Sequence, residues 1–241
     1  MKLKDPVRHS PDAEAAKPKE TKNGRDRMEK TERLCAGITV NTQSSIRVAC
    51  QAAGTEKVLY FDPLEIRGEV HDADVIFITH AHGDHCSPAD IAKVGKEGTV
   101  IVCPKGMGMD GAFPVVPGKR YEAGGIVFGT VAAYNRLKPF HPKRNGWVGY
   151  VVETDDGRVY VAGDTDATRE AEAVSCDVAL VPVGGKYTMT AEEAADLVNT
   201  IRPAAAIPTH YGTIVGKPED GELFAQHVTE GIKVEKKLRF D

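Results

Sequence analysis

The run His80-Ala81-His82-Gly83-Asp84-His85 follows directly on an apolar, β-type stretch at residues 75–79. Residues i and i+2 of an extended segment point the same way, so His80 and His82 can offer imidazole nitrogens to one metal ion at roughly 2.0–2.1 Å. Asp84 and His85 follow where the chain begins to turn, aimed at a second ion beside the first. Four potential ligands at the end of a buried strand predict a metal site rather than a His-rich surface loop.

Further candidate ligands come after other apolar runs. Asp164 follows the strand-like segment 159–162 through Gly163, and a carboxylate there can bridge two ions. His210 ends the run that starts at residue 205, and His141 lies in a proline-flanked loop. Each signal is weak alone, because an Asp at a strand end is usually a turn former and a His between prolines is usually just a loop residue. Their interpretation as ligands therefore depends on the first motif.

The order of these motifs resembles that of the metallo-β-lactamase superfamily, from about Met28 to the C-terminus. The phrases YFDP at 60–63, AGDTD at 162–166 and IPTHYGT at 207–213 are similar to those of short prokaryotic metal-dependent hydrolases related to L-ascorbate-6-phosphate lactonase. The resemblance implies an α/β fold, the four-layer αβ/βα sandwich of the metallo-β-lactamases.

The resemblance also implies a ligand set for two divalent ions. One ion would be held by His80, His82 and His141, and the other by Asp84, His85 and His210. Asp164 would bridge the two, and Asp62 would orient ligands without binding metal. The number of imidazoles favours zinc, and manganese or iron(II) is compatible with the same set.

Two positions narrow the expected reaction. Asp164 stands where the main dinuclear β-lactamases carry a Cys, which argues against an antibiotic-degrading role. His82 stands where the flavodiiron redox branch carries Glu, which argues against an oxygen or nitric oxide reductase. The expected activity is hydrolysis of a small-molecule ester, lactone or phosphodiester, with an anionic substrate favoured. The alternatives are a nuclease-type phosphodiesterase and a metal-binding regulatory module without turnover.

Three side chains are candidates for catalysis beyond metal binding. Asp84 can orient the attacking water and accept its proton, while Tyr211 and Lys186 are candidates for protonating or neutralising the leaving group. A packed aromatic and a solvated charge are equally good interpretations of the latter two. Cys86 is expected to pack as a small apolar side chain rather than to bind metal.

Composition limits the partners. The net charge of −4 and the pI near 6.1 give no general basic field, so no nucleic acid partner is expected. Five cysteines without a CxxC pair fit reduced thiols and a cytoplasmic location. We found no signal peptide and no membrane span, so no membrane association is expected.

The chain divides into a charged tail at residues 1–27, expected to be disordered, and a hydrolase domain at 28–241. Strands are predicted at 37–41, 45–50, 57–61, 75–79, 99–103, 126–133, 148–153, 158–162 and 178–181. Helices are predicted at 87–94, at 190–199 behind a capping box at Thr190 and Glu193, and at 218–228.

Overall fold

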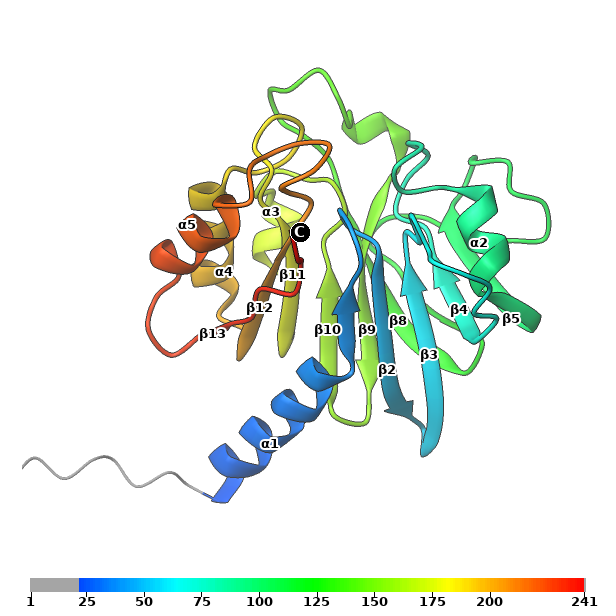
Figure 1. The fold of residues 1–241 in the computed structure, drawn as a ribbon, viewed down its shortest axis with the longest axis horizontal. Helices are drawn as coiled ribbons and strands as arrows, with labels where there is room; N and C mark the ends of the chain where they lie inside the picture. The colour runs from blue at the N-terminus through cyan, green and yellow to red at the C-terminus, as the bar shows by residue number, and fades with distance from the viewer. Residues whose placement is uncertain (1–21, 241) are drawn as a thin grey trace, which may run out of the picture.

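The computed structural model describes residues 22–240, in which two β-sheets pack face to face (Figure 1). The first sheet has the order β1-β2-β3-β4-β5-β6 and the second β13-β12-β11-β10-β9-β8-β7. Both begin with antiparallel pairs in chain order and continue with parallel ones. The strands of the first sheet are β1 (Ile38–Val40), β2 (Ile46–Ala52), β3 (Thr55–Phe61), β4 (Ala73–Phe77), β5 (Gly95–Pro104) and β6 (Phe113–Val115). Those of the second are β7 (Arg120–Ala123), β8 (Ile126–Ala132), β9 (Val148–Thr154), β10 (Gly157–Val161), β11 (Val178–Pro182), β12 (Ala205–Thr209) and β13 (Lys233–Val234).

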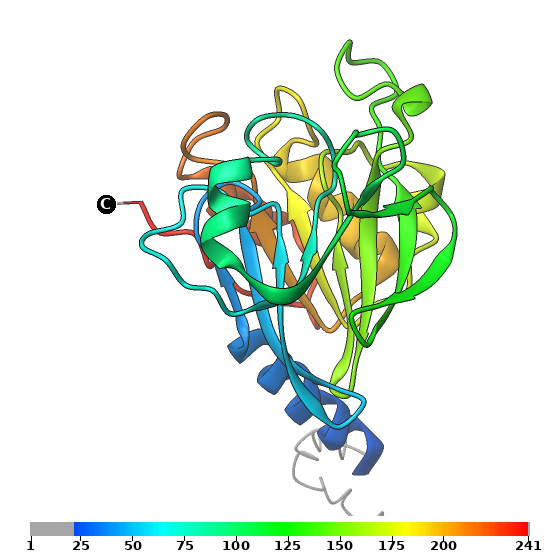
Figure 2. The same cartoon turned by 90° about the vertical axis from the view of Figure 1, so that its right-hand side faces the viewer.

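Helices cover the outer faces of the two sheets, so the predicted four-layer αβ/βα sandwich is confirmed (Figures 1 and 2). Helix α2 packs on the first sheet, and α3, α4 and α5 pack on the second. The helices are α1 (Lys22–Ala36), α2 (Pro88–Val94), α3 (Arg169–Glu172), the 3₁₀ turn η1 (Lys143–Asn145), α4 (Ala191–Ile201) and α5 (Asp220–His227). No helix among residues 22–240 is long and apolar enough to span a bilayer.

Aromatic side chains join the two sheets beneath the ligand loops. Phe77 of β4 lies 5.0 Å from Phe128 of β8 and 4.9 Å from Tyr150 of β9, between ring centroids. The Tyr150 hydroxyl donates a hydrogen bond of 2.7 Å to the Ile78 carbonyl, two residues before His80. The core therefore fixes the end of β4, where the HAHGDH run begins.

Local signals correctly predicted two helices. Helix α2 has Ser87 as its N-cap and Pro88 in its first turn, and α4 has the predicted capping box, in which Thr190 and Glu193 satisfy each other's backbone N–H.

Helix α1 was not predicted. It begins at Lys22, inside the segment 1–27 that was expected to be disordered, and residues 1–21 of that segment lie outside the described residues. The sequence signal was weak because few apolar side chains of α1 are buried, among them Leu34 and Cys35 near its end. Ion pairs also attach the helix, joining Arg27 to Asp177 and Arg33 to Asp156.

Candidate metal centre

The predicted ligands come from loops that meet at one end of the sandwich, the end where the parallel strands finish. The HAHGDH run follows β4, His141 lies between β8 and β9, Asp164 follows β10, and His210 follows β12. Helix α1 lies at the opposite end (Figure 1). The carboxyl ends of parallel strands deliver side chains to one edge of a sheet, and here two sheets deliver them to one cleft.

The first group of ligand atoms is formed by His80, His82 and His141, which lie within 4.8 Å of one another. His80 Nε2 is 3.1 Å from His82 Nδ1. Trp147 stands behind this group, with its ring centroid 4.9 Å from those of His80 and His82 and 5.4 Å from that of His141. Three imidazoles converging at this spacing can hold one divalent ion.

The second group is formed by Asp84, His85 and His210, again within 4.8 Å of one another. His210 Nε2 is 3.1 Å from His85 Nε2, and both nitrogens lie 3.5 Å from Asp84 Oδ2. This group supplies two nitrogens and a carboxylate, which is also a suitable donor set for zinc.

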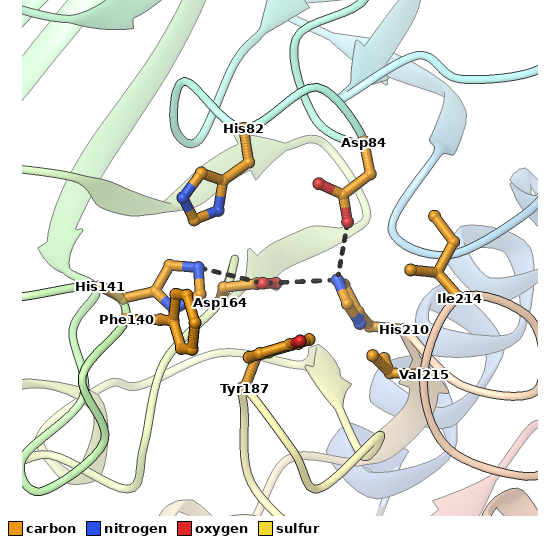
Figure 3. A pocket seen from close by; sticks show the side chains of 9 residues that line it. All are labelled: His82, Asp84, Phe140, His141, Asp164, Tyr187, His210, Ile214 and Val215. Carbon is orange, nitrogen blue, oxygen red and sulfur yellow. Dashed lines mark ion pairs between the residues drawn. The ribbon is translucent and has the colours of Figure 1, made fainter.

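Asp164 lies between the two groups (Figure 3). Its Oδ2 is 3.3 Å from His141 Nε2 of the first group and 3.3 Å from His210 Nε2 of the second, and its Oδ1 is 3.4 Å from His85 Nε2. Asp164 Oδ1 and His141 Nε2 are buried without a hydrogen-bond partner in the described structure. Burying polar atoms without a partner costs free energy, and a cation bound between these potential metal ligands would offset that cost.

Asp62 orients one histidine of each group. Its Oδ2 accepts a 2.8 Å bond from His85 Nδ1, and it also accepts a 2.6 Å bond from the Thr79 hydroxyl. That hydroxyl lies 2.9 Å from His80 Nδ1 and, having donated to Asp62, accepts from this nitrogen. Both histidines thus carry a proton on Nδ1 and turn Nε2 toward the cluster, the usual arrangement behind a metal-binding imidazole.

Burial and charge set the protonation of the two groups differently. Burial and the neighbouring His85 hold the pKa of His80 well below its usual range, and burial together with His141 lowers the pKa of His82. Burial also opposes a charge on His85, but Asp164 and Asp62 outweigh it and raise the pKa of His85 to about 9. Asp164 shows the reverse balance, because His210 and His85 outweigh burial and lower its pKa well below the usual range.

Three residues of the site have a strained backbone. Asp62, His141 and His210 have φ values of 46°, 58° and 57°, in the left-handed region that side chains other than glycine rarely adopt. Such residues cost on the order of 1–3 kcal/mol each and cluster at functional sites. Gly83, in contrast, does not have a positive φ, and a Cβ atom at this position would have no heavy atom within 4 Å outside its neighbours in the chain. The turn at this position therefore does not require glycine.

A cavity of about 370 Å³ opens above the two groups. Its polar lining consists of five predicted ligands, and its remaining lining is apolar or aromatic (Figure 3): Phe140, Tyr187, Ile214 and Val215. We call these four side chains the apolar rim. None of these four side chains, nor Trp147, was predicted from the sequence, because they lie in irregular loops without hydrophobic periodicity.

The structure does not bring Tyr211 or Lys186 into this lining. Tyr211 is buried, packs its ring 5.3 Å from Phe240, and burial raises its pKa to about 12. Lys186 is exposed, with Nζ 5.1 Å from the centroid of the Tyr187 ring. The phenol that lines the cavity is that of Tyr187. Of the two interpretations of Tyr211, the structure agrees with the packed aromatic, because the chain turns this side chain into the core directly after His210.

Cys86 packs as predicted. Its sulfur lies 3.9 Å from the Met109 sulfur, at the edge of the apolar cluster between the first sheet and α2, and it belongs to none of the ligand groups among the described residues.

Comparison with known proteins agrees with this architecture. The family model described as the beta-lactamase superfamily domain matches residues 40–210. A UPF0173 metal-dependent hydrolase of Methanopyrus kandleri is 34% identical over 180 residues, covering 68% of this chain and 78% of that protein. A UPF0173 metal-dependent hydrolase of Thermococcus onnurineus is 31% identical over 206 residues, covering 77% and 91%.

A solved structure described as a metal-dependent hydrolase from Parabacteroides distasonis superposes with a TM-score of 0.70 at 28% identity, covering 84% of this chain and 93% of that one. Fold and site thus define a metal-dependent hydrolase of the metallo-β-lactamase type. The chain belongs to that superfamily and is similar to its UPF0173 hydrolases. The finer resemblance to the lactonase stays a prediction.

Proposed function

We propose that the protein is a dinuclear metal-dependent hydrolase of small-molecule esters or lactones. His80, His82 and His141 would hold one ion, Asp84, His85 and His210 the other, and Asp164 would contact both. The observation that carries the proposal is the position of Asp164, whose two oxygens lie within 3.4 Å of nitrogens from both groups. Zinc is the favoured metal because five of the seven ligands are imidazoles.

Bound divalent ions would polarise the scissile group and lower the pKa of a coordinated water toward neutrality. We assign the transfer of the proton to Asp84. Its Oδ2 is occupied by His85 and His210, while the side chain is one quarter exposed and lines the cavity. Its Oδ1 is thus available to accept a proton from the attacking water.

In the reaction, the oxygen of one water forms a bond to the acyl carbon, and the bond from that carbon to the leaving oxygen breaks. One water proton passes through Asp84 to the leaving oxygen, and the other is released from the carboxylic acid product. His85 and His80 hold their orientation through Asp62, so the cluster need not rearrange during the step.

Metal analysis and a substrate panel test the proposal. Purified protein should contain two zinc ions per chain after reconstitution. Zinc-loaded or manganese-loaded protein should then hydrolyse lactones or esters in a panel that also holds thioesters and phosphodiesters, and chelation should abolish the activity. One ion per chain would contradict the dinuclear assignment. Two ions without hydrolysis of any class would favour a metal-binding regulatory module.

A further inference from the structure

Apart from the predicted ligands, the lining of the cavity is apolar or aromatic, and among residues 22–240 the only hydroxyl on these lining side chains is that of Tyr187. Phe140 and Tyr187 contact each other edge to face, with centroids 4.7 Å apart, and Ile214 and Val215 close the side next to His210 (Figure 3). Two of these side chains are about half exposed to water, Phe140 at 46% and Ile214 at 59%. Leu137, on the same loop as Phe140, is 97% exposed. Exposed apolar side chains gathered at a cavity mark a binding surface.

No lysine or arginine lines the cavity in the described structure. Two lysines of the loop that carries Phe140 are paired outside the cavity: Lys138 Nζ contacts Asp166 and donates to the Thr188 carbonyl, and Lys143 pairs with Glu170. Lys186 is exposed and lies over the Tyr187 ring without being part of the lining. An anionic group held away from the ligand cluster would therefore have no cationic partner in the cavity lining, and burying an unpaired charge is costly.

We infer that the substrate is an uncharged ester or lactone that carries an apolar chain, and that this chain binds against the apolar rim. The identity of the reactive group, an ester or lactone, rests on the proposed function. The apolar chain is inferred from the apolar rim. The volume of about 370 Å³ is at the small end of ligand pockets, which run to roughly 1,000 Å³. The chain is accordingly short or medium in length. Water cleaves the acyl–oxygen bond: its oxygen bonds to the acyl carbon, and one of its protons passes through Asp84 to the leaving oxygen.

Binding of ketones that cannot be hydrolysed tests the rim separately from catalysis. Trp147 is the single tryptophan of the chain and contacts the first ligand group, so its fluorescence reports occupancy of the site. In zinc-loaded protein, Kd should fall about fourfold for each methylene from 2-butanone to 2-octanone, the value for a buried methylene. The matched polar ketone 8-hydroxy-2-octanone should bind at least about tenfold more weakly than 2-octanone. A flat series, or equal binding of the hydroxyketone, would overturn the inference.

Variants locate the effect. Ile214→Ser should reduce the ratio of Kd values between 2-butanone and 2-octanone by roughly threefold to tenfold. Val116→Ser is the matched control, since Val116 is 38% exposed and is not part of the cavity lining, and it should leave the ratio unchanged. Equal ratios in wild type and Ile214→Ser would remove the rim from the binding site.

A parallel series of 4-nitrophenyl acetate, butyrate and hexanoate separates the two proposals. kcat/KM should rise with chain length as ketone affinity does. Chain-dependent ketone binding without hydrolysis of any ester or lactone would sink the proposed function and leave the rim assignment standing. Hydrolysis with no dependence on chain length in either series would sink the rim assignment alone.

Discussion

The ligand cluster at the base of the cavity and the apolar rim above it differ in how the fold holds them. In the cluster, His80, His85 and Asp164 are buried, and Asp62 and Thr79 fix two of the imidazoles by hydrogen bonds. In the rim, Phe140 and Ile214 project from irregular loops and are about half exposed. The cluster can carry out the same reaction on different substrates, because its geometry is fixed by the fold. The rim residues, in contrast, can be substituted with little loss of folding stability.

The difference teaches where reaction and specificity are encoded. Reaction depends on buried polar groups whose loss leaves uncompensated partners, so substitutions there should act on metal binding and turnover together. Specificity depends on exposed apolar area, so substitutions there should act on one substrate relative to another. The predictions below test this division, in order of decreasing effect.

The largest effect is expected for Asp164→Ala. The substitution removes the carboxylate whose oxygens lie within 3.4 Å of nitrogens from both ligand groups. It should therefore abolish measurable hydrolysis and reduce the zinc content to below two ions per chain. Metal analysis and kcat/KM check the result. Asp156→Ala, which removes an ion pair with Arg33 at the opposite end, is the control and should keep both ions. Two tightly bound ions in the Asp164 variant would refute its role between them.

Asp62→Asn should reduce zinc affinity or kcat/KM by about 10- to 100-fold, the usual cost of losing an outer partner of a metal-binding histidine. The amide has one oxygen where the carboxylate uses two to accept from Thr79 and His85, and it lacks the charge facing His85. The dependence of ketone binding on chain length should not change. Asp74→Asn, which alters a carboxylate paired with Lys96, provides a control that should retain activity.

The ligand cluster could be predicted from the sequence, whereas the apolar rim could not. The HAHGDH run, Asp164 and His210 could be recognised because they follow the ends of apolar strands, and hydrophobic periodicity locates such strands. His141 and Asp62 needed the resemblance to a family, since nothing local distinguishes a histidine in a proline-flanked loop. The rim was not predictable, because Phe140, Tyr187 and Ile214 become neighbours only when loops from three parts of the second half fold together. Tyr211 is next to His210 in the sequence, and only the fold shows that its ring packs in the core beside Phe240.

Zinc uptake should be coupled to proton release at the second group. In the metal-free protein the pKa of His85 is raised to about 9, so His85 carries a proton at pH 7 that zinc must displace. Zinc affinity should therefore rise by up to about tenfold per pH unit and level off above about pH 9. Calorimetry in buffers of different ionisation enthalpy measures the proton count, which should fall in Asp62→Asn. Affinity that is independent of pH between 7 and 9 would show that His85 is already neutral.

The smallest effect is expected for Lys186→Ala. Lys186 is exposed, and its contact with the Tyr187 ring is of a kind worth about 0.5–1 kcal/mol at exposed sites, only part of which would reach a bound substrate. We expect kcat/KM to change by less than about threefold, and equally for neutral esters and for carboxylate-bearing ones. Lys138→Ala is the informative comparison, because Lys138 joins Asp166 to the Thr188 carbonyl and so ties the loop of Phe140 to that of Tyr187. Its loss should flatten the chain-length dependence that the rim produces. A selective rise in KM for anionic substrates in Lys186→Ala would instead return this lysine to the site, and would mean that the rim faces a charged group.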